Sequence, residues 1–377
     1  MMRAVVQAAA AVEGTNRMNV RKLEKTEHIK TRKLWEEIFW EDTPEFLDYY
    51  YTVKTAENEI YVIEEGDHIC AMLHLNPYTM QVAGKSFPTH YIVAVATEEK
   101  YRHQGMMRSL LKKALSDMRE NGEPFTFLMP AAEQIYYPHG FRYIYKQQQG
   151  NIRKTAVKRE EWTISHATEE DCEEIAVFVN TILEEQYEVY AMRSQHYYEV
   201  LLEEQKSEQG GILILRENQK ITGVFPYAMG EECEIREPLF LGEGEKILPY
   251  ISAYLSEEKE TKVLGYGDME KPMIMAKVLD VEKMFSCIKA TKEIHLKIQI
   301  WDTLTNESIG CFLVEGREEI RAKKIEETKE CVCIDVGDLT SLLFGVADME
   351  NLRVSSEVKE ELLKIVPLTK VYLNEVV

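Results

Sequence analysis

Basic charge, paired cysteines and long apolar runs are all scarce in this sequence. It carries 45 Lys and Arg against 65 Asp and Glu, a formal net charge of −20. This balance disfavours nucleic-acid binding, because phosphate neutralisation needs a basic face. The seven cysteines are scattered and odd in number, which argues against a secreted disulfide framework and for a reducing cytoplasm. No run approaches the roughly 20 apolar residues of a membrane-spanning helix, so we expect a cytoplasmic protein with no membrane partner.

Metal-ligand spacing is also missing from the sequence. Cys331 and Cys333 would share one face of a strand, but no matching Cys/His pair lies nearby, and the nine histidines show no metal-binding spacing. We therefore expect no metal. The alanine-rich start, residues 1–17, lacks the long apolar core and clear cleavage context of a signal peptide. We interpret it as an extension, with Met18 as an alternative start.

The length and composition indicate a globular protein of several domains. At roughly 150 residues per domain, 377 residues suggest two or three domains, and an apolar fraction of 45% is ordinary for such proteins. No low-complexity segment or long linker separates the predicted elements. We predict a mixed α/β (α+β) protein whose three domains, residues 18–150, 151–271 and 272–377, pack together.

One stretch, residues 91–145, organises the first domain. Tyr91–Thr97 is uncharged and rich in β-branched and small residues, which is typical of a buried strand. Apolar residues then recur at helical spacing over Met106–Met118, and Phe125–Met129 reads as the next strand. Between the first strand and the helix lies the basic turn Arg102-His103-Gln104-Gly105.

That turn has the properties of a pyrophosphate-binding loop. Backbone N–H groups at a helix start point in one direction, and the helix dipole favours an anion there. Gly105 lets the backbone approach a ligand closely, and Arg102 supplies positive charge. The pattern R-x-x-G is weak alone, but its place between a buried strand and an amphipathic helix makes it moderately specific.

Two motifs carry a resemblance to a known family. Val95-Ala96-Thr97 followed by Tyr101–Met106 resembles the acetyl-CoA motif of the GCN5-related N-acetyltransferases (GNAT). Glu133–Tyr136 followed by Gly140-Phe141 resembles the Eis (enhanced intracellular survival) branch of that family. The resemblance implies tandem GNAT-like domains, a C-terminal sterol-carrier-protein-like domain, acetyl-CoA as co-substrate, and a homo-oligomer, specifically a hexamer.

The resemblance also implies which residues bind the donor. The backbone of strand 93–97 would pair with the pantetheine arm, and the N–H groups of residues 103–108 would bind the pyrophosphate. The predicted donor-binding residues are Val95, Ala96, Thr97, Arg102, His103, Gln104, Gly105, Met106, Met107, Arg108, Ala132 and Glu133.

Acetyl transfer further needs an acid for the leaving thiolate and a base for the amine. Tyr136 is the predicted acid, because a phenol stays protonated at neutral pH and its spacing to Gly140-Phe141 matches the family. Tyr137 and His139 remain alternatives. The resemblance implies that the α-carboxylate of the last residue, Val377, is the base, although many relatives end in an aromatic residue. No cysteine or serine stands in a nucleophile setting, so we expect direct transfer.

The acceptor is predicted to be a cationic amine of aminoglycoside, polyamine or lysine type. The segment between the first two predicted helices contains Phe39, Trp40, Glu41 and Asp42. The resemblance implies that these residues shape the acceptor site, because GNAT enzymes often form it from this segment. Aromatic faces beside carboxylates suit a protonated amine, although a loop that caps the core would explain the same residues. Glu375, in the apolar tail, is interpreted as either a substrate contact or a solvated side chain.

The segment from Trp162 to about Leu241 repeats the element order of the first domain without R-x-x-G. The acidic stretch Gly242–Lys246 stands where that turn would be, so we interpret the repeat as a degenerate copy kept for scaffold or oligomer contacts. The α+β block after Pro272 resembles the sterol-carrier-like fold. The alternative function is therefore a non-catalytic acyl-CoA- or lipid-binding protein, or a regulatory scaffold.

Overall fold

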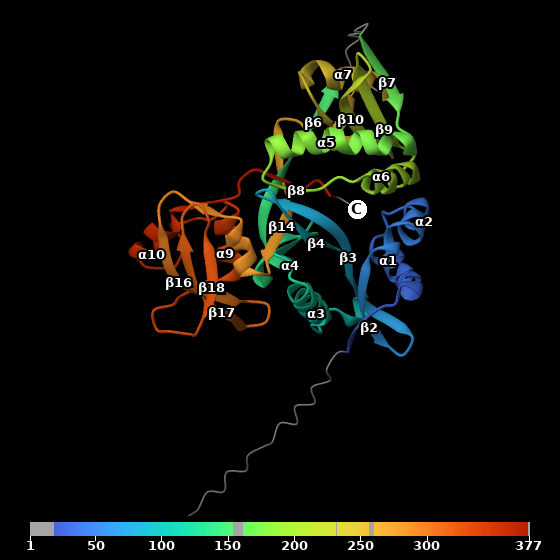
Figure 1. The fold of residues 1–377 in the computed structure, drawn as a ribbon. Coiled ribbons are helices and arrows are strands. Elements are labelled where there is room, and N and C mark those ends of the chain that lie inside the picture. The colour runs from blue at the N-terminus through green and yellow to red at the C-terminus, as the bar shows by residue number, and fades with distance from the viewer. Residues whose placement is uncertain (1–18, 154–160, 231, 256–259, 376–377) are drawn as a thin grey trace, which may run out of the picture.

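The computed structural model describes residues 19–153, 161–230, 232–255 and 260–375. A 15-stranded sheet runs through this part of the chain, with the main order β1-β2-β3-β4-β5-β14-β6-β13-β11-β10-β9-β7. Figure 1 shows three units: a first unit at the right and centre, a second unit at the top, and a C-terminal unit at the left. The large sheet runs through the first and second units.

The first unit covers one half of the sheet with helices on both faces. Ile60 and Val62 of β2 pack with α1 and α2, whereas the alternating Tyr61 and Ile63 pack with α3, as the two-residue period of a strand requires. Thr43 caps α2, since its side chain accepts a hydrogen bond from the Phe46 N–H. The elements are β1 (Val20–Lys22), η1 (Lys25–Thr31), α1 (Arg32–Ile38), α2 (Pro44–Thr52), η2 (Lys54–Ala56), β2 (Glu59–Glu65), β3 (His68–Val82), β4 (Lys85–Thr97), η3 (Glu99–Tyr101), α3 (Met106–Glu120), β5 (Phe125–Leu128), α4 (Glu133–Tyr136), η4 (Tyr137–His139) and β6 (Arg142–Arg153).

The second unit packs its helices on the other half of the sheet. Its hairpin of β9 and β10 is antiparallel, as the sequence pattern predicts. Strand β6 of the first unit pairs with β13 of the second, so the sheet continues from one unit to the other. The elements are β7 (Trp162–His166), η5 (Glu169–Asp171), α5 (Cys172–Gln186), β8 (Val189–Ala191), α6 (Gln195–Ser207), β9 (Gly211–Glu217), β10 (Lys220–Met229), β11 (Cys233–Arg236), β12 (Leu239–Phe240), α7 (Gly244–Leu255) and β13 (Glu260–Leu264).

Strand β14 (Met269–Val278) returns the chain to the first unit, where it lies between β5 and β6. The predicted domain boundary between residues 271 and 272 therefore lies inside this strand. The C-terminal unit that follows has a four-stranded sheet of order β18-β17-β16-β19. Its elements are α8 (Val281–Ser286), β15 (Lys289–Ala290), β16 (Ile294–Asp302), β17 (Glu307–Gly316), β18 (Arg321–Ile325), β19 (Val332–Asp335), α9 (Val336–Leu343), α10 (Ser356–Leu362), β20 (Ile365–Val366) and β21 (Val371–Tyr372).

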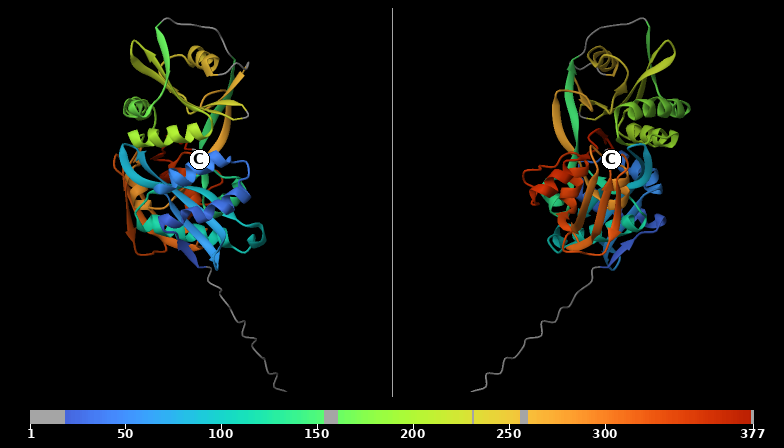
Figure 2. Two further views of the ribbon diagram at one scale, coloured as in Figure 1. Left: turned by 90° about the vertical axis from the view of Figure 1, so that its right-hand side faces the viewer. Right: turned by 60° about the vertical axis from the view of Figure 1, so that its left-hand side comes forward.

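One hydrophobic core joins the first unit to the C-terminal unit. Leu110 of α3, Ile274 of β14, Ile298 of β16 and Leu339 of α9 all belong to the same cluster of buried side chains. The last strand, β21, lies between the second unit and the first, and the red end of the chain occupies this place in both views of Figure 2. Within the described part of the chain, no helix is long and apolar enough to cross a membrane.

Candidate active site

Two parallel strands of the first unit separate after a short pairing. Strands β4 and β5 pair at Tyr91–Phe127 and Ile92–Leu128, and β5 ends there while β4 continues to Thr97. The backbone of β4 kinks at Ala94, which has a positive φ of 50° where the register against β3 shifts. The backbone of residues 93–97 thus borders a gap in the sheet that an extended ligand can pair with.

The turn before α3 follows the end of β4 in the chain. His103 and Gly105 both have left-handed backbone conformations, with φ of 62° and 82°. Gly105 is the N-cap of α3, and no side chain caps the helix. A Cβ at Gly105 would meet no atom within 4 Å, so the turn is open to a ligand. These features fit an anion such as pyrophosphate at the helix N-terminus.

Two arginines near the turn have different roles. The Nε of Arg102 donates to the Thr97 carbonyl at 3.2 Å, and the side chain is exposed at the end of β4. Arg108 donates through Nε and Nη2 to the Leu304 carbonyl, at 3.1 and 2.7 Å. Arg108 therefore ties the first turn of α3 to the C-terminal unit, a contact that the sequence did not reveal.

The two candidate tyrosines lie in different environments. Tyr136, the last residue of α4, is 7% exposed and packs edge-on against Phe141 at 5.8 Å. Burial raises the pKa of Tyr136 to about 12, so the phenol is a proton donor at neutral pH. Tyr137 is 47% exposed and lies beneath the Arg142 guanidinium, 3.8 Å from its ring centroid. Of the two tyrosines, only Tyr136 is thus buried.

The loop behind Tyr136 is held by a buried ion pair. Lys277 Nζ lies 2.7 Å from Asp302 Oδ1 and donates to the His139 carbonyl at 2.9 Å. Arg119 of α3 also reaches Asp302, at 3.3 Å. Burial lowers the pKa of the His139 ring, which makes this alternative acid a poorer proton donor at neutral pH.

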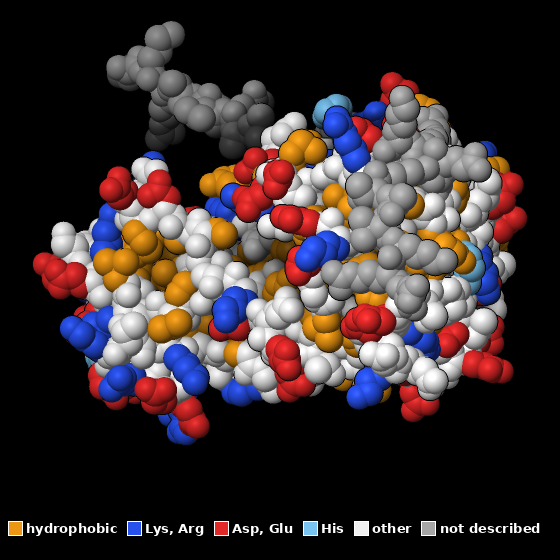
Figure 3. Space-filling model, turned by 90° about the horizontal axis from the view of Figure 1, so that it is seen from above, with side chains coloured by type: hydrophobic (Ala, Val, Ile, Leu, Met, Phe, Trp, Pro, Cys, Tyr) orange, Lys and Arg blue, Asp and Glu red, His pale blue; other side chains and the backbone are white. Residues whose placement is uncertain are grey.

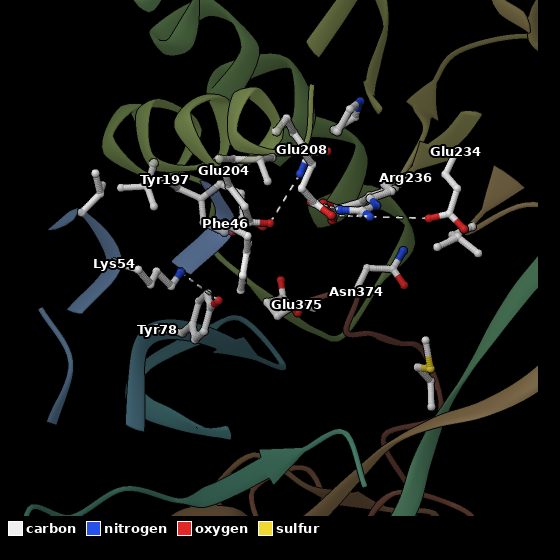
Figure 4. Close-up of a pocket in the computed structure, with 18 of the residues that line it drawn as sticks. Phe46, Lys54, Tyr78, Tyr197, Glu204, Glu208, Glu234, Arg236, Asn374 and Glu375 are labelled. Atoms are coloured by element: carbon white, nitrogen blue, oxygen red, sulfur yellow. Dashed lines mark hydrogen bonds and ion pairs between the residues drawn. The ribbon is translucent and has the colours of Figure 1, made fainter. Parts of the chain in front are cut away.

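An acidic cavity of about 790 Å³ lies between the first and second units. In Figure 4, Tyr197 and Glu204 line it from α6 and Glu208 from just after α6, Lys54 and Tyr78 from the first unit, and Asn374 and Glu375 from the tail. Its carboxylates are Glu41, Asp42, Glu57, Glu204, Glu208, Glu234, Glu237 and Glu375, and its lysines and arginines are Lys54, Arg236, Lys262 and Lys271. This excess of carboxylates favours a cationic ligand.

The chain's own tail forms one wall of this cavity. Strand β21 pairs in parallel with β8, and β8 pairs with β3 of the first unit. Asn374 accepts hydrogen bonds from the Tyr145 hydroxyl and the Gln147 amide, both at 3.0 Å. Glu375 is 2% exposed and forms an ion pair with Arg193, which also pairs with Glu237. The interpretation of Glu375 as a solvated side chain is therefore wrong.

The predicted acceptor residues divide into two groups. Glu41, Asp42 and Glu375 line the cavity, whereas Phe39 and Trp40 are not among its lining residues. Phe39 packs against Trp35 at 5.5 Å, and Trp40 is 76% exposed. Val377, the predicted base, lies outside the described residues.

The predicted donor residues lie where β4 ends and where α3 and α4 begin. Val95, Ala96 and Thr97 end β4, the turn of residues 102–105 follows them, and Met106, Met107 and Arg108 begin α3. Ala132 and Glu133 begin α4, just after β5. Because parallel strands end at the same edge of a sheet, β4 and β5 bring these segments together.

The comparisons with known proteins agree with this geometry. Residues 19–144 match the family model of the acetyltransferase (GNAT) domain. The first unit is a GNAT acetyltransferase domain. No curated protein matches the sequence. Among the described residues, no three His, Cys, Asp or Glu side chains converge as a metal site requires.

Solved structures resemble the chain over nearly its whole length. A probable N-acyltransferase from Enterococcus faecalis V583 is 17% identical, with a TM-score of 0.77, covering 94% of this chain and 99% of the other. A GCN5-related N-acetyltransferase from Kribbella flavida is 12% identical, with a TM-score of 0.74 and coverages of 95% and 98%. Eis1 from Mycobacterium abscessus is 12% identical, with a TM-score of 0.68 and coverages of 95% and 99%. At these identities the likeness shows a shared fold, and the predicted mixed α/β class is confirmed.

Proposed function

We propose that the protein transfers the acetyl group of acetyl-CoA to an amine of a cationic small molecule, of aminoglycoside or polyamine type, or of a lysine side chain. The observation that carries this proposal is the acidic cavity beside a GNAT domain that retains its phosphate turn and a buried tyrosine. Acceptor binding needs the cavity, donor binding needs the phosphate turn, and proton transfer needs the tyrosine.

The turn and the end of β4 serve the donor in this proposal. The N–H groups at the start of α3 hold the pyrophosphate, and Gly105 lets it approach the backbone. The free backbone of residues 93–97 pairs with the pantetheine arm and directs the thioester towards the point where β4 and β5 separate. Holding both reactants in this way lowers the entropic part of the barrier.

The transfer itself is direct. The amine nitrogen attacks the thioester carbonyl carbon, the C–N bond forms and the C–S bond breaks. Tyr136 donates its phenolic proton to the departing thiolate, and a base takes the proton of the attacking amine. We assign the base to the α-carboxylate of Val377, because Asn374 and Glu375, which come shortly before it in the chain, line the acidic cavity.

An amine panel tests the proposed function. Purified protein is mixed with acetyl-CoA and, in separate reactions, a triamine, an aminoglycoside and a lysine peptide, and the products are weighed by mass spectrometry. We expect at least one polycation to gain an acetyl group, at a rate that increases with enzyme concentration. If none of the amines is acetylated while acetyl-CoA still binds, the protein is the non-catalytic acyl-CoA binder of the alternative.

The assignment of Val377 has its own test. A short glycine-serine extension after Val377 moves the carboxylate away, so we expect the turnover rate to fall by about 10²- to 10⁴-fold, the range of general acid–base catalysis. The same extension placed before Met1 is the control and should leave the rate unchanged. An extended tail with full activity would contradict the assignment.

Three further properties are proposed from the resemblance. We propose that the C-terminal unit is sterol-carrier-protein-like in fold, that the protein forms a homo-oligomer, specifically a hexamer, and that it acts in the cytoplasm without nucleic acid, membrane or metal. Light scattering coupled to size-exclusion chromatography measures the oligomer directly, and a monomer would overturn that part.

A further inference from the structure

A buried charge cluster links the tail to the second unit. The Arg193 side chain has no exposed surface, and it forms ion pairs with Glu237 and with Glu375. The Glu375 side chain is equally inaccessible. Charges in such a place are stable only when they are paired, and removal of one partner leaves the other charge buried and uncompensated.

Contacts within the second unit hold Arg193 independently of the tail. The Arg193 N–H donates to the Asn180 side-chain oxygen at 3.0 Å, and the Asn180 amide donates to the Arg193 carbonyl at 2.6 Å. The Arg193 guanidinium lies over the Tyr197 ring, 4.3 Å from its centroid. Asn180 belongs to α5 and Tyr197 to α6, so one helix of the second unit holds the Arg193 backbone and another contacts its guanidinium.

The rest of the tail also binds largely to the second unit. Val371 and Tyr372 pair with Val189 and Tyr190 of β8. The N–H groups of Glu188 and Val189 donate to the Lys370 carbonyl at 2.7 and 3.1 Å. The Tyr372 ring packs against Tyr187 at 4.8 Å. The tail is thus held by a strand pairing, a ring contact and a buried ion pair within eight residues of the second unit's chain.

The second unit lines the acceptor cavity but lacks a phosphate turn of its own. Where the first unit has its phosphate turn, the second has Gly242–Lys246 before and within α7, and this stretch carries the ion pair Lys246–Glu243. We propose that the second unit is the dock for the tail, and that Arg193 is the positioning residue that holds Glu375 in the wall of the acceptor cavity, beside Asn374, which β6 holds. The effect of Arg193 on catalysis rests on the proposed function, but its effect on the tail does not.

The proposal is tested with three variants of the full chain. Arg193→Met removes the guanidinium, and Glu375→Gln cuts the tail link while the Arg193–Glu237 pair remains. Arg216→Met is the matched control, because Arg216 lies in the same unit and also pairs with two carboxylates, Glu174 and Asp171. The second variant keeps the test valid if Arg193→Met fails to fold.

The first readout is the tail itself. Each variant is treated with a carboxypeptidase and weighed by mass spectrometry. We expect the unaltered chain and Arg216→Met to keep residues 371–375, and Arg193→Met and Glu375→Gln to lose them. If the tails of both tail-link variants resist trimming as well as the unaltered tail, Arg193 is not what holds the tail and the proposal is overturned.

The second readout is the kinetics with a polyamine acceptor. We expect the kcat of Arg193→Met to fall about 10- to 100-fold, as a misplaced group near the reaction does, with KM for acetyl-CoA unchanged. Tail release with full kcat would overturn the positioning role. Tail release in a chain that acetylates no amine would leave the dock in place and contradict only the proposed function.

Discussion

At the scale of single residues, burial decides which of two adjacent tyrosines can act as an acid. Tyr136 and Tyr137 are equivalent in the sequence, where spacing alone favours the first. The structure buries Tyr136 and exposes Tyr137 beneath Arg142. The sequence could not show this difference, because it depends on how α4 packs against Phe141 and on where β6 brings Arg142.

The raised pKa of Tyr136 has a consequence for the pH profile. A phenol with a pKa of about 12 stays protonated through pH 10. The pH at which Tyr136 loses its proton, and can no longer act as an acid, is therefore higher than for an ordinary tyrosine. We expect kcat to remain level from neutral pH to about pH 10. A measurement of kcat against pH checks this, and an alkaline limb centred near pH 9 that persists in Tyr137→Phe would contradict it.

A buried histidine controls stability at acid pH. His74 is fully buried, its Nδ1 lies 3.2 Å from the Tyr50 hydroxyl, and burial lowers its pKa from 6.5 to about 3. The unfolded chain therefore binds more protons between these two values, so the free energy of unfolding falls as pH drops below 6.5.

Urea unfolding at several pH values measures this effect. We expect His74 to contribute a loss of up to about 1.4 kcal/mol per pH unit in that window. His74→Phe should flatten this part of the curve, whereas the control His196→Phe should not, because His196 is largely exposed. An identical slope in His74→Phe would contradict the account.

At the scale of elements, the local sequence pattern predicts the turn before α3 and the elements on either side of it. The strand, turn, helix and strand of residues 91–128 are predictable, because each has a local pattern of apolar residues or a Gly signal. Several elements were missed, among them β6, β8, α7 and β13. The place of β14 between β5 and β6 could not be predicted either, since pairing partners depend on contacts between distant parts of the chain.

A comparison of two glycine variants distinguishes the structural role of the turn from its role in donor binding. Gly105 and Gly84 have nearly the same backbone, with φ of 82° and 80°, and a Cβ at either would meet nothing within 4 Å. We expect Gly105→Ala and Gly84→Ala to lose similar stability, about 1 kcal/mol, from the strained conformation. Only Gly105→Ala should raise KM for acetyl-CoA, which steady-state kinetics measures. Equal KM values in the two variants would remove the turn from donor binding.

At the scale of the whole molecule, the site is assembled from segments that are far apart in the chain. Residues 41–58, 192–208, 234–237 and 374–375 all contribute to one cavity. Glu41 and Asp42 could be anticipated from their place between two helices, but Lys54, Arg193 and Glu204 carry no sequence signal. On the face seen in Figure 3, acidic and basic side chains are intermingled. The acidic excess of the cavity is thus a local feature as well as a property of the composition.

The charge of the cavity predicts a salt dependence. Carboxylates outnumber lysines and arginines in the cavity lining, and the attraction between a polycation and this excess negative charge weakens as the Debye length falls from about 20–30 Å to about 8 Å on going from low to physiological ionic strength. We expect KM for a triamine to rise several-fold over this range, and KM for a monoamine to rise less. Equal changes for the two amines would contradict electrostatic recognition by the cavity.

The most direct test of the central claim is the rate of CoA release from acetyl-CoA in the presence of a polyamine, compared for the unaltered chain, Tyr136→Phe and Tyr137→Phe. We predict that Tyr136→Phe lowers kcat by about 10²- to 10⁴-fold while acetyl-CoA still binds, and that Tyr137→Phe changes it little. Full activity in Tyr136→Phe would contradict the assignment of Tyr136 as the acid.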